Sequence, residues 1–402
     1  MNEVIVGSVL TLCIAFGIVP IFLTFRFRRR LEVLLKASAP PPGAPVAVII
    51  PCKGLDQGFQ ENIQSFLAQE NLLIQLIFVV AKADDPAFPE LVRLVNDHAQ
   101  MGRVGVTASV HVAGIDNRRA QKLTNQLHGL THVAQDTKFL VFLDSDIRPD
   151  PGFVGRLISP LQDTSIAATT GFRWYHPTAA TVGSMLRSTW NAGALPLLTN
   201  PGTIFAFGGA MAITRCEFEK AKIAEAWEKA LSDDFPFTLG VKKLGKELRF
   251  VPSCIAVSFE SSTLAETIEF TNRQSIISRI YFPPLWWGAA LGHSFANIFV
   301  FSGIYGLIEL LSGGGLAALL LACCLVLIPM QCLNAVVMLD SVPLLLPQLN
   351  SQFSKLRKYY VWCAPLASLL SLINTIYSLT TRQIVWRGIR YELVSTTETR
   401  VL

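Results

Sequence analysis

The stretch Phe139-Leu140-Val141-Phe142-Leu143-Asp144-Ser145-Asp146 joins a short apolar run to two carboxylates. An apolar run of this length predicts a strand that is buried on both faces of a parallel sheet. Ligands of open α/β sheets bind at the carboxyl ends of the strands. The sequence therefore places Asp144 and Asp146 where a ligand binds.

These two acids also indicate the chemistry of the site. Two carboxylates one residue apart repel each other unless a positive charge offsets them, and a hard divalent cation with oxygen ligands does so. Carboxylates favour Mg²⁺ or Mn²⁺. We therefore predict that Asp144 and Asp146 bind a divalent metal ion. The alternative is a solvated turn, because Asp and Ser are also common turn residues.

The composition is that of a membrane protein with a globular middle. Hydrophobic residues make up 51% of the 402 residues and charged residues 16%, and the mean hydropathy is +0.43. Residues 4–25 carry no charge and are long enough to cross a bilayer, and four arginines follow them at positions 26, 28, 29 and 30. No basic cluster precedes the apolar stretch, unlike in a signal peptide. We predict a retained anchor over residues 1–30, with its basic flank and the following domain on the cytoplasmic face.

Residues 31–45 form a proline-rich linker, and an alternating pattern begins after it. Strands are expected at 46–50, 76–80, 104–112 and 139–143. Amphipathic helices are expected between them, marked by three apolar groups: Ile63, Phe66 and Leu67; Leu91, Leu94 and Val95; Leu123, Leu127 and Leu130. Such alternation predicts an α/β domain with a mostly parallel sheet flanked by helices, here over residues 46–282.

The charge argues against a nucleic-acid-binding protein, and the cysteine pattern argues against a protein built around zinc or disulfides. The net charge of +5 is largely explained by the basic flank and an arginine-containing tail, so it gives no reason to expect a nucleic-acid partner. The eight cysteines show no CxxC pairing, which argues against a zinc site or a disulfide framework.

Seven short motifs carry a resemblance to a known family. In chain order they are Val48-Ile49-Ile50-Pro51-Cys52-Lys53-Gly54, Asp84-Asp85-Pro86-Ala87, the stretch 117–125 with Lys122, Phe142-Leu143-Asp144-Ser145-Asp146, Gly208-Gly209-Ala210-Met211-Ala212, Asp233-Asp234-Phe235 and Trp386-Arg387-Gly388-Ile389-Arg390-Tyr391. With them the chain resembles glycosyltransferase family 2 and its relatives, most closely the membrane-bound ceramide glucosyltransferases. The resemblance implies a GT-A domain between an N-terminal transmembrane anchor and C-terminal transmembrane or interfacial helices.

The resemblance also implies a donor site. A UDP-sugar carries a diphosphate leaving group, and a divalent ion on Asp146, with Asp144 nearby, would neutralise the charge that develops there. Further donor-site residues implied by the resemblance are Lys53, Asp84, Asp85 and Lys122. For the two lysines, a purely solvated side chain is the alternative.

Asp234 resembles the catalytic base of the family. An inverting transfer needs a carboxylate within hydrogen-bond reach of the acceptor hydroxyl. The segment Ser232-Asp233-Asp234 precedes a helical stretch, so helix capping is the alternative role for these residues. Both roles are compatible if Ser232 or Asp233 caps the helix and Asp234 reaches the acceptor.

One motif departs from the family. Relatives have Arg-Trp just before the C-terminal membrane region, whereas Arg279 is followed here by Ile280. Arg279 remains a predicted contact of the donor diphosphate. The missing tryptophan argues against a polymerising synthase.

Residues 283–380 form the predicted C-terminal membrane region, with candidate spans at 285–311, 316–339 and 361–379. Three crossings would place the basic tail, residues 381–402, outside, against the positive-inside rule. We therefore expect one segment to be interfacial or re-entrant, or an extra partial pass over residues 342–349.

Taken with the resemblance, these features predict an inverting glycosyltransferase. It would move a single sugar, glucose, from a UDP-sugar to the hydroxyl of a membrane lipid such as ceramide, with Mn²⁺ or Mg²⁺ as cofactor. The alternatives are a processive polysaccharide synthase and a non-catalytic transporter or scaffold. The intact acids Asp144, Asp146 and Asp234 argue against the non-catalytic alternatives.

Overall fold

The computed structural model describes residues 3–36, 41–70, 72–102 and 104–402, which form two compact units. The helical unit comprises the described residues of Met1–Glu32, Ala179–Pro196 and Ser261–Thr381. The sheet unit comprises Val33–Thr178, Leu197–Glu260 and Arg382–Leu402. The sequence prediction instead treats residues 46–282 as one continuous domain. Each unit is built from segments that are far apart in the sequence.

The sheet unit is centred on a seven-stranded sheet with the order β3-β2-β1-β4-β6-β5-β7. Its strands are β1 (Val46–Pro51), β2 (Ile74–Val80), β3 (Val106–Val112), β4 (Phe139–Leu143), β5 (Ile166–Pro177), β6 (Ala210–Thr214) and β7 (Glu247–Glu260). Only β6 is antiparallel to its neighbours. The expected class, an α/β domain with a mostly parallel sheet, is confirmed.

Helices pack against this sheet, as the apolar spacing predicts. They are α2 (Phe59–Leu67), α3 (Ala87–Gln100), α4 (Gln121–Leu130), α5 (Phe153–Ile158), α7 (Arg215–Lys220), α8 (Ile223–Trp227) and α9 (Asp234–Lys243), with short 3₁₀ turns η1 (Ser159–Gln162) and η2 (Leu195–Thr199). Helix α2 buries Ile63, Phe66 and Leu67 in a core shared with β1, β2 and β4. Burial of these side chains drives the packing of the helix on the sheet.

Strand register gathers three loops at one edge of the sheet. Strands β1 and β4 run parallel, with Val46 opposite Phe139, so the segments after Pro51 and after Leu143 leave from the same edge. Strand β6 runs antiparallel to β4 with Ala210 opposite Leu143. The glycines that precede β6 therefore arrive beside the acids that follow β4.

The tail folds as part of the sheet unit. It forms a small antiparallel sheet of β8 (Gln383–Trp386), β9 (Ile389–Leu393) and β10 (Thr399–Val401). Tyr391 and Leu393 are buried, and the Tyr391 hydroxyl accepts a hydrogen bond from the backbone N–H of Gln121 at 3.3 Å. Residues 381–402, predicted as a basic tail, thus carry an ordered hairpin whose apolar side chains are buried.

The helical unit contains four helical segments that are long and apolar enough to cross a membrane: Val4–Lys36, Pro283–Leu311, Leu316–Leu345 and Pro347–Thr380. Its elements are α1 (Glu3–Lys36), α6 (Val182–Ala192), α10 (Leu264–Tyr281), α11 (Pro283–Leu311), α12 (Leu316–Ala322), η3 (Cys323–Val326), α13 (Leu327–Leu339), α14 (Val342–Leu345), η4 (Pro347–Leu349) and α15 (Asn350–Thr380). The predicted spans are found, with longer bounds. Residues 31–36, predicted as the start of the linker, instead continue helix α1, and linker residues 37–40 lie outside the described residues.

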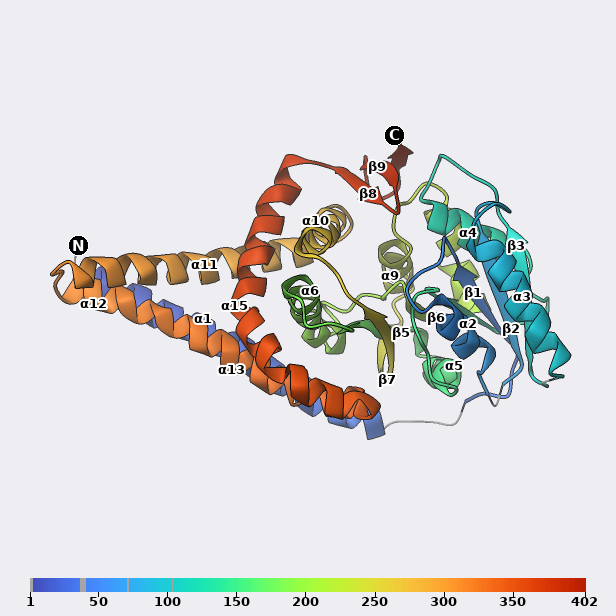
Figure 1. Cartoon of the computed structure of the whole chain (residues 1–402), viewed down its shortest axis with the longest axis horizontal. Coiled ribbons are helices and arrows are strands. Elements are labelled where there is room, and N and C mark those ends of the chain that lie inside the picture. The colour runs from blue at the N-terminus through green and yellow to red at the C-terminus, as the bar shows by residue number, and fades with distance from the viewer. Residues whose placement is uncertain (1–2, 37–40, 71, 103) are drawn as a thin grey trace. The chain divides into compact units, whose positions relative to one another are not determined.

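Within the helical unit, α11 forms a hairpin with α12, which continues through η3 into α13, and α1 runs alongside this hairpin (Figure 1). An apolar cluster joins these helices, formed by Cys13, Ala296, Phe299, Cys324 and Leu327. Helix α15 packs on both α6 and α10. Many large apolar side chains of α1 and α11 are exposed, as expected of helices that face lipid.

Candidate active site

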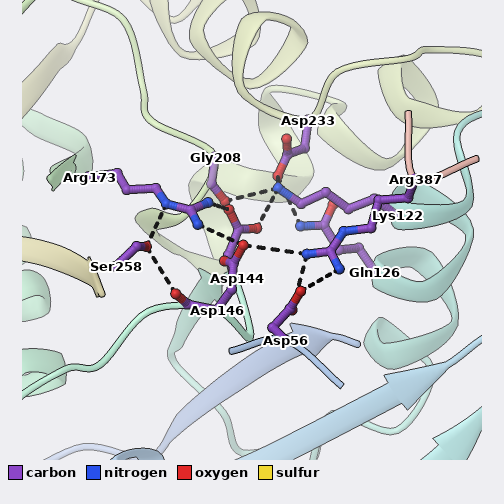
Figure 2. Close-up of polar contacts among 10 residues, drawn as sticks. All are labelled: Asp56, Lys122, Gln126, Asp144, Asp146, Arg173, Gly208, Asp233, Ser258 and Arg387. Carbon is purple, nitrogen blue, oxygen red and sulfur yellow. Dashed lines mark hydrogen bonds and ion pairs between the residues drawn. The ribbon is translucent and has the colours of Figure 1, made fainter. Parts of the chain in front are cut away.

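Lys122 forms ion pairs with two acids, Asp144 after β4 and Asp233 just before α9. The ammonium of Lys122, near the start of α4, lies 2.7 Å from Asp144 Oδ1 and 2.8 Å from Asp233 Oδ2 (Figure 2). Burial opposes the charged form, but the negative charges of Asp144 and Asp233 raise the pKa of Lys122. A buried cation held by two carboxylates needs this pairing, because an unpaired charge inside a protein is costly.

The two adjacent acids Asp233 and Asp234 have different surroundings. Asp233 accepts hydrogen bonds from Lys122 and from Gln126 Nε2, the latter at 3.0 Å. Asp234 Oδ1 accepts hydrogen bonds from the Ser232 hydroxyl and from the Phe235 backbone N–H, the latter at 2.7 Å. Burial and the negative charge of Asp233 raise the pKa of Asp234 to about 7. Asp233 is thus an ion-pair partner, whereas Asp234 has the proton affinity of a general base that works near neutral pH.

Asp233 does not take the alternative role of helix capping. Asp233 occupies the N-cap position of α9, but its side chain makes no capping hydrogen bond. Asp234 is already the first helical residue. The Asp233 carboxylate therefore bonds to Lys122 and Gln126 rather than to the free N–H groups of the helix, whereas Asp234 Oδ1 accepts from one of those groups, the Phe235 N–H.

Arg173 on β5 contacts both acids that follow β4. Its Nη2 lies 2.6 Å from Asp146 Oδ2, and its Nη1 lies 3.4 Å from Asp144 Oδ2. Its Nε donates to the Ser258 hydroxyl at 2.8 Å, and that hydroxyl donates to the Asp146 carbonyl at 2.9 Å. Arg173 is not among the site residues predicted from the sequence. The available signal was a charged residue within an otherwise uncharged strand, because a buried arginine requires an anionic partner.

The two acids after β4 differ in their proton affinity. Burial raises the pKa of Asp144, although Lys122 opposes the rise. Burial acts in the same direction on Asp146, but the positive charges of Arg173 and Arg387 lower the pKa of Asp146. Asp146 Oδ1 is buried and has no hydrogen-bond partner among the described residues. Asp146 is therefore an ionised carboxylate whose buried Oδ1 is open, that is, without a hydrogen-bond partner among the described residues.

The glycines before β6 approach the acids closely. A Cβ atom on Gly208 would lie 2.6 Å from Asp233 Oδ1, and one on Gly209 would lie 2.9 Å from Asp144 Oδ2. The Gly208 carbonyl also accepts a hydrogen bond from Lys122 at 3.3 Å. Only glycine leaves room here for the backbone and the carboxylates together.

The remaining predicted site residues have other contacts. Asp85 Oδ1 accepts from the backbone N–H groups of Gly54 and Ala87, both at 2.9 Å, whereas Asp84 is exposed. Arg279 lies in the helical unit, where it donates to the Thr381 carbonyl at 3.0 Å. Their roles at a donor site stay predictions.

A second arginine in the cluster comes from the tail. Arg387 contacts Asp56 and Asp146, and its carbonyl accepts a hydrogen bond from Lys53 Nζ at 2.6 Å. Arg387 belongs to one of the motifs that carry the family resemblance, but no role is predicted for it from the sequence. Neither its separation from Asp146 nor its exposed position in a turn signals this contact.

The residues present fit a divalent ion only if the substrate supplies further ligands. Among the described residues, no group of three or more His, Cys, Asp or Glu side chains is arranged to hold a metal. Asp146 Oδ1 nevertheless provides one open, ionised oxygen. Mg²⁺ is commonly bound through one or two carboxylates together with substrate phosphates and water. Such a donor set matches this cluster.

The family model of glycosyl transferase family 21 matches residues 9–399 of the 402. The chain belongs to glycosyl transferase family 21. It is therefore a glycosyltransferase, as the sequence predicts. The search against curated proteins found no match.

Several solved glycosyltransferase structures resemble this family 21 chain. A mannosyltransferase from Pyrobaculum calidifontis, solved with GDP-Man and Mn²⁺, is 14% identical over 91% of this chain and 99% of its own, with a TM-score of 0.45. A glucosyl-3-phosphoglycerate synthase from Mycobacterium tuberculosis, solved with Mn²⁺, UDP and glucosyl-3-phosphoglycerate, is 16% identical over 61% and 81%, with a TM-score of 0.36. S. aureus TarS, solved with UDP-GlcNAc, is 10% identical over 89% and 99%, with a TM-score of 0.36. At these identities and TM-scores, the likenesses assign no donor, acceptor or metal to this chain.

Proposed function

We propose that this family 21 glycosyltransferase transfers one glucose from UDP-glucose, with inversion, to the hydroxyl of a membrane lipid such as ceramide. The observation that carries the proposal is the buried cluster in which Lys122 joins Asp144 to Asp233. It brings the acids at the strand end, suited to the donor, into one site with the adjacent Asp234, suited to an acceptor hydroxyl.

The donor side of the proposal rests on Asp146. Its open Oδ1 would hold Mn²⁺ or Mg²⁺, which when bound neutralises the charge that develops on the diphosphate leaving group. Arg173 keeps Asp146 ionised and fixes its other oxygen. Asp144, held by Lys122, adds negative charge near the ion. Lys53, Asp84, Asp85 and Arg279 remain the proposed further contacts of the donor.

The acceptor side rests on Asp234. A lipid hydroxyl is a weak nucleophile until its proton is removed, and a carboxylate with a pKa of about 7 is suited to remove it near neutral pH. The proton would pass to Asp234 as the acceptor oxygen bonds to the anomeric carbon. The bond from that carbon to the diphosphate oxygen breaks in the same step, so the diphosphate leaves with the electron pair.

Four apolar helical segments support a lipid as the acceptor, because a membrane-resident enzyme meets its acceptor within the bilayer. The arginines at positions 26, 28, 29 and 30 directly follow the first apolar stretch. By the positive-inside rule they support a cytoplasmic catalytic domain.

Chain connectivity limits the number of crossings. Arg382–Leu402 folds with the sheet unit, so the chain must end on the side of the membrane where that unit lies. An even number of the three C-terminal segments therefore crosses. We infer that α15 is the segment that does not cross, because it pairs polar groups with α6 and α10, including Ser188 Oγ with Tyr360 Oη at 2.7 Å and Thr271 Oγ1 with Asn374 Oδ1 at 3.2 Å.

The proposal is tested by incubating membranes that contain the protein with radiolabelled UDP-sugars and a panel of lipids, including ceramide and diacylglycerol. Thin-layer chromatography should reveal a single-sugar glycolipid, formed from UDP-glucose and ceramide and absent with the Asp234→Asn variant. A water-soluble polymer that lengthens with time would instead support a polysaccharide synthase. If no sugar is transferred to any lipid in the panel, the lipid-acceptor proposal is wrong.

A further inference from the structure

Arg387 has an unusual backbone conformation at the tip of the β8–β9 hairpin. Trp386 pairs with Ile389, so the hairpin loop consists of Arg387 and Gly388, with φ angles of 49° and 79°. Two-residue loops with positive φ at both positions favour Asn-Gly, and a long side chain at the first position is costly. Besides Lys222, Arg387 is the only non-glycine residue with positive φ in the described part of the chain. Such outliers cluster at functional sites.

The hairpin tip is fixed to the loop that follows β1. The guanidinium makes a two-pronged contact with Asp56, with Nη1 at 2.7 Å from Oδ1 and Nη2 at 3.1 Å from Oδ2. Nη1 also donates to the Lys53 carbonyl at 3.1 Å, and Lys53 Nζ donates to the Arg387 carbonyl at 2.6 Å. These contacts hold the arginine in one orientation, so little conformational freedom is lost when a ligand binds.

In this orientation the guanidinium lies beside Asp146. Nη2 is 3.4 Å from Asp146 Oδ2, the oxygen that Arg173 also contacts, while Oδ1 of the same carboxylate has no partner among the described residues (Figure 2). None of the contacts described for Arg387 uses its Nε–H group. A planar guanidinium with a free donor is suited to phosphate oxygens.

We propose that Arg387 binds the diphosphate of the sugar donor, so that the C-terminal hairpin contributes a residue to the active site. The inference rests on the proposed function, since it assumes a nucleotide-sugar donor beside Asp146. The alternative is that Arg387 only anchors the tail through Asp56.

The test compares a ligand with a diphosphate to one without. Purified full-length protein in detergent, with saturating Mn²⁺, is titrated calorimetrically with UDP and with uridine. In Arg387→Gln, the affinity for UDP should fall about 10- to 100-fold, as expected for loss of hydrogen bonds to a charged group, while the affinity for uridine stays unchanged. The UDP affinity of Arg387→Lys should lie between those of the wild type and Arg387→Gln, because lysine keeps the charge but loses the two-pronged geometry of the guanidinium.

Arg390→Gln is the matched control, because Arg390 is an exposed arginine on the same hairpin, and it should bind both ligands as the wild type does. Thermal unfolding of each variant verifies that the protein is folded. Equal losses for UDP and uridine, or none for either, would show that Arg387 is only an anchor. If the wild type itself binds no UDP, the proposed donor is wrong and the inference fails with it. Normal UDP binding by both wild type and Arg387→Gln would overturn the inference alone.

Discussion

The two units of this glycosyltransferase place polar and apolar groups in opposite ways. In the sheet unit, apolar side chains of β1, β2 and β4 fill the core, and charged groups gather at one edge of the sheet. In the helical unit, large apolar side chains are exposed, and uncharged polar groups are paired between helices. Thr24 Oγ1 on α1, for example, donates to Asn334 Oδ1 on α13 at 2.7 Å.

This contrast follows from the surroundings that each unit is built for. Water drives apolar groups into a core, whereas lipid gives no such drive, and helices in lipid associate through packing and hydrogen bonds. Polar groups inside the sheet unit should therefore matter mainly for chemistry and charge balance. Those inside the helical unit should each contribute a small amount of stability.

The largest effect is expected for Asp234→Asn. Removing the base should lower turnover about 10²- to 10⁴-fold without loss of UDP binding. In the wild type, kcat/KM should rise with pH and level off above about pH 7, because Asp234 must lose its proton before it can accept one, and its pKa is about 7. Kinetic pH profiles measure this rise. The control is Asp136→Asn, which alters an exposed acid. Unchanged turnover in Asp234→Asn would move the search for the base to Asp233.

Lys122→Met should have the next largest effect, this time on stability. It leaves Asp144 and Asp233 buried without their shared cation, and breaking a buried ion pair typically costs about 3–5 kcal/mol. The free energy of unfolding in detergent is the measurement. Lys138→Met, at an exposed position in the same unit, should change it little. A loss below about 1 kcal/mol would mean that this charged cluster is not a buried one, which would weaken the contrast between the units.

Asp146→Asn should lower turnover about 10²- to 10³-fold, the usual size of losing one electrostatic contribution to the transition state. Excess EDTA should inactivate the wild type and have little further effect on the variant. The fold should persist, because Asp146 follows a strand and contributes little to the apolar core. Full wild-type activity in EDTA would exclude the metal from the mechanism.

The smallest effect is expected in the helical unit. Thr24→Val removes the hydrogen bond between α1 and α13, and such bonds in membranes contribute about 0.6 kcal/mol on average. Turnover should be preserved. Ser8→Ala is the control on the same helix, because the Ser8 hydroxyl bonds within its own helix to the Val4 carbonyl. A loss for Thr24→Val as large as that for Lys122→Met would contradict the difference between the two units.

Local pattern predicts the individual elements well. The strand over residues 139–143 has the predicted bounds, and β2 and β3 differ from the prediction by two residues at their starts. The candidate spans are longer than predicted. The last of the three C-terminal spans begins at Pro347 rather than at residue 361. The charged residues Lys355, Arg357 and Lys358 lie near the start of this helix. Because they lower the local hydropathy, the sequence predicts a start that is too late.

The assembly of the site was less predictable. The sequence indicates Asp144, Asp146 and Lys122 through their motifs, and the structure brings all three into one cluster. The sequence gives no role to Arg173, whose signal is a single charge in an otherwise uncharged strand, or to Arg387. Arg279, expected at the donor site, contacts Thr381 in the helical unit.

By itself, the sequence determined which segments are apolar enough for a membrane, where strands and helices alternate, and that two acids follow a buried strand. These are local properties, because hydrophobic period and segment length are read from neighbouring residues. Only the tertiary structure decided how the acids are neutralised. Arg387 lies 241 residues from Asp146 in the chain, and Gln126 lies 107 from Asp233. Such contacts arise from strand order and register, which bring distant segments to one edge of the sheet.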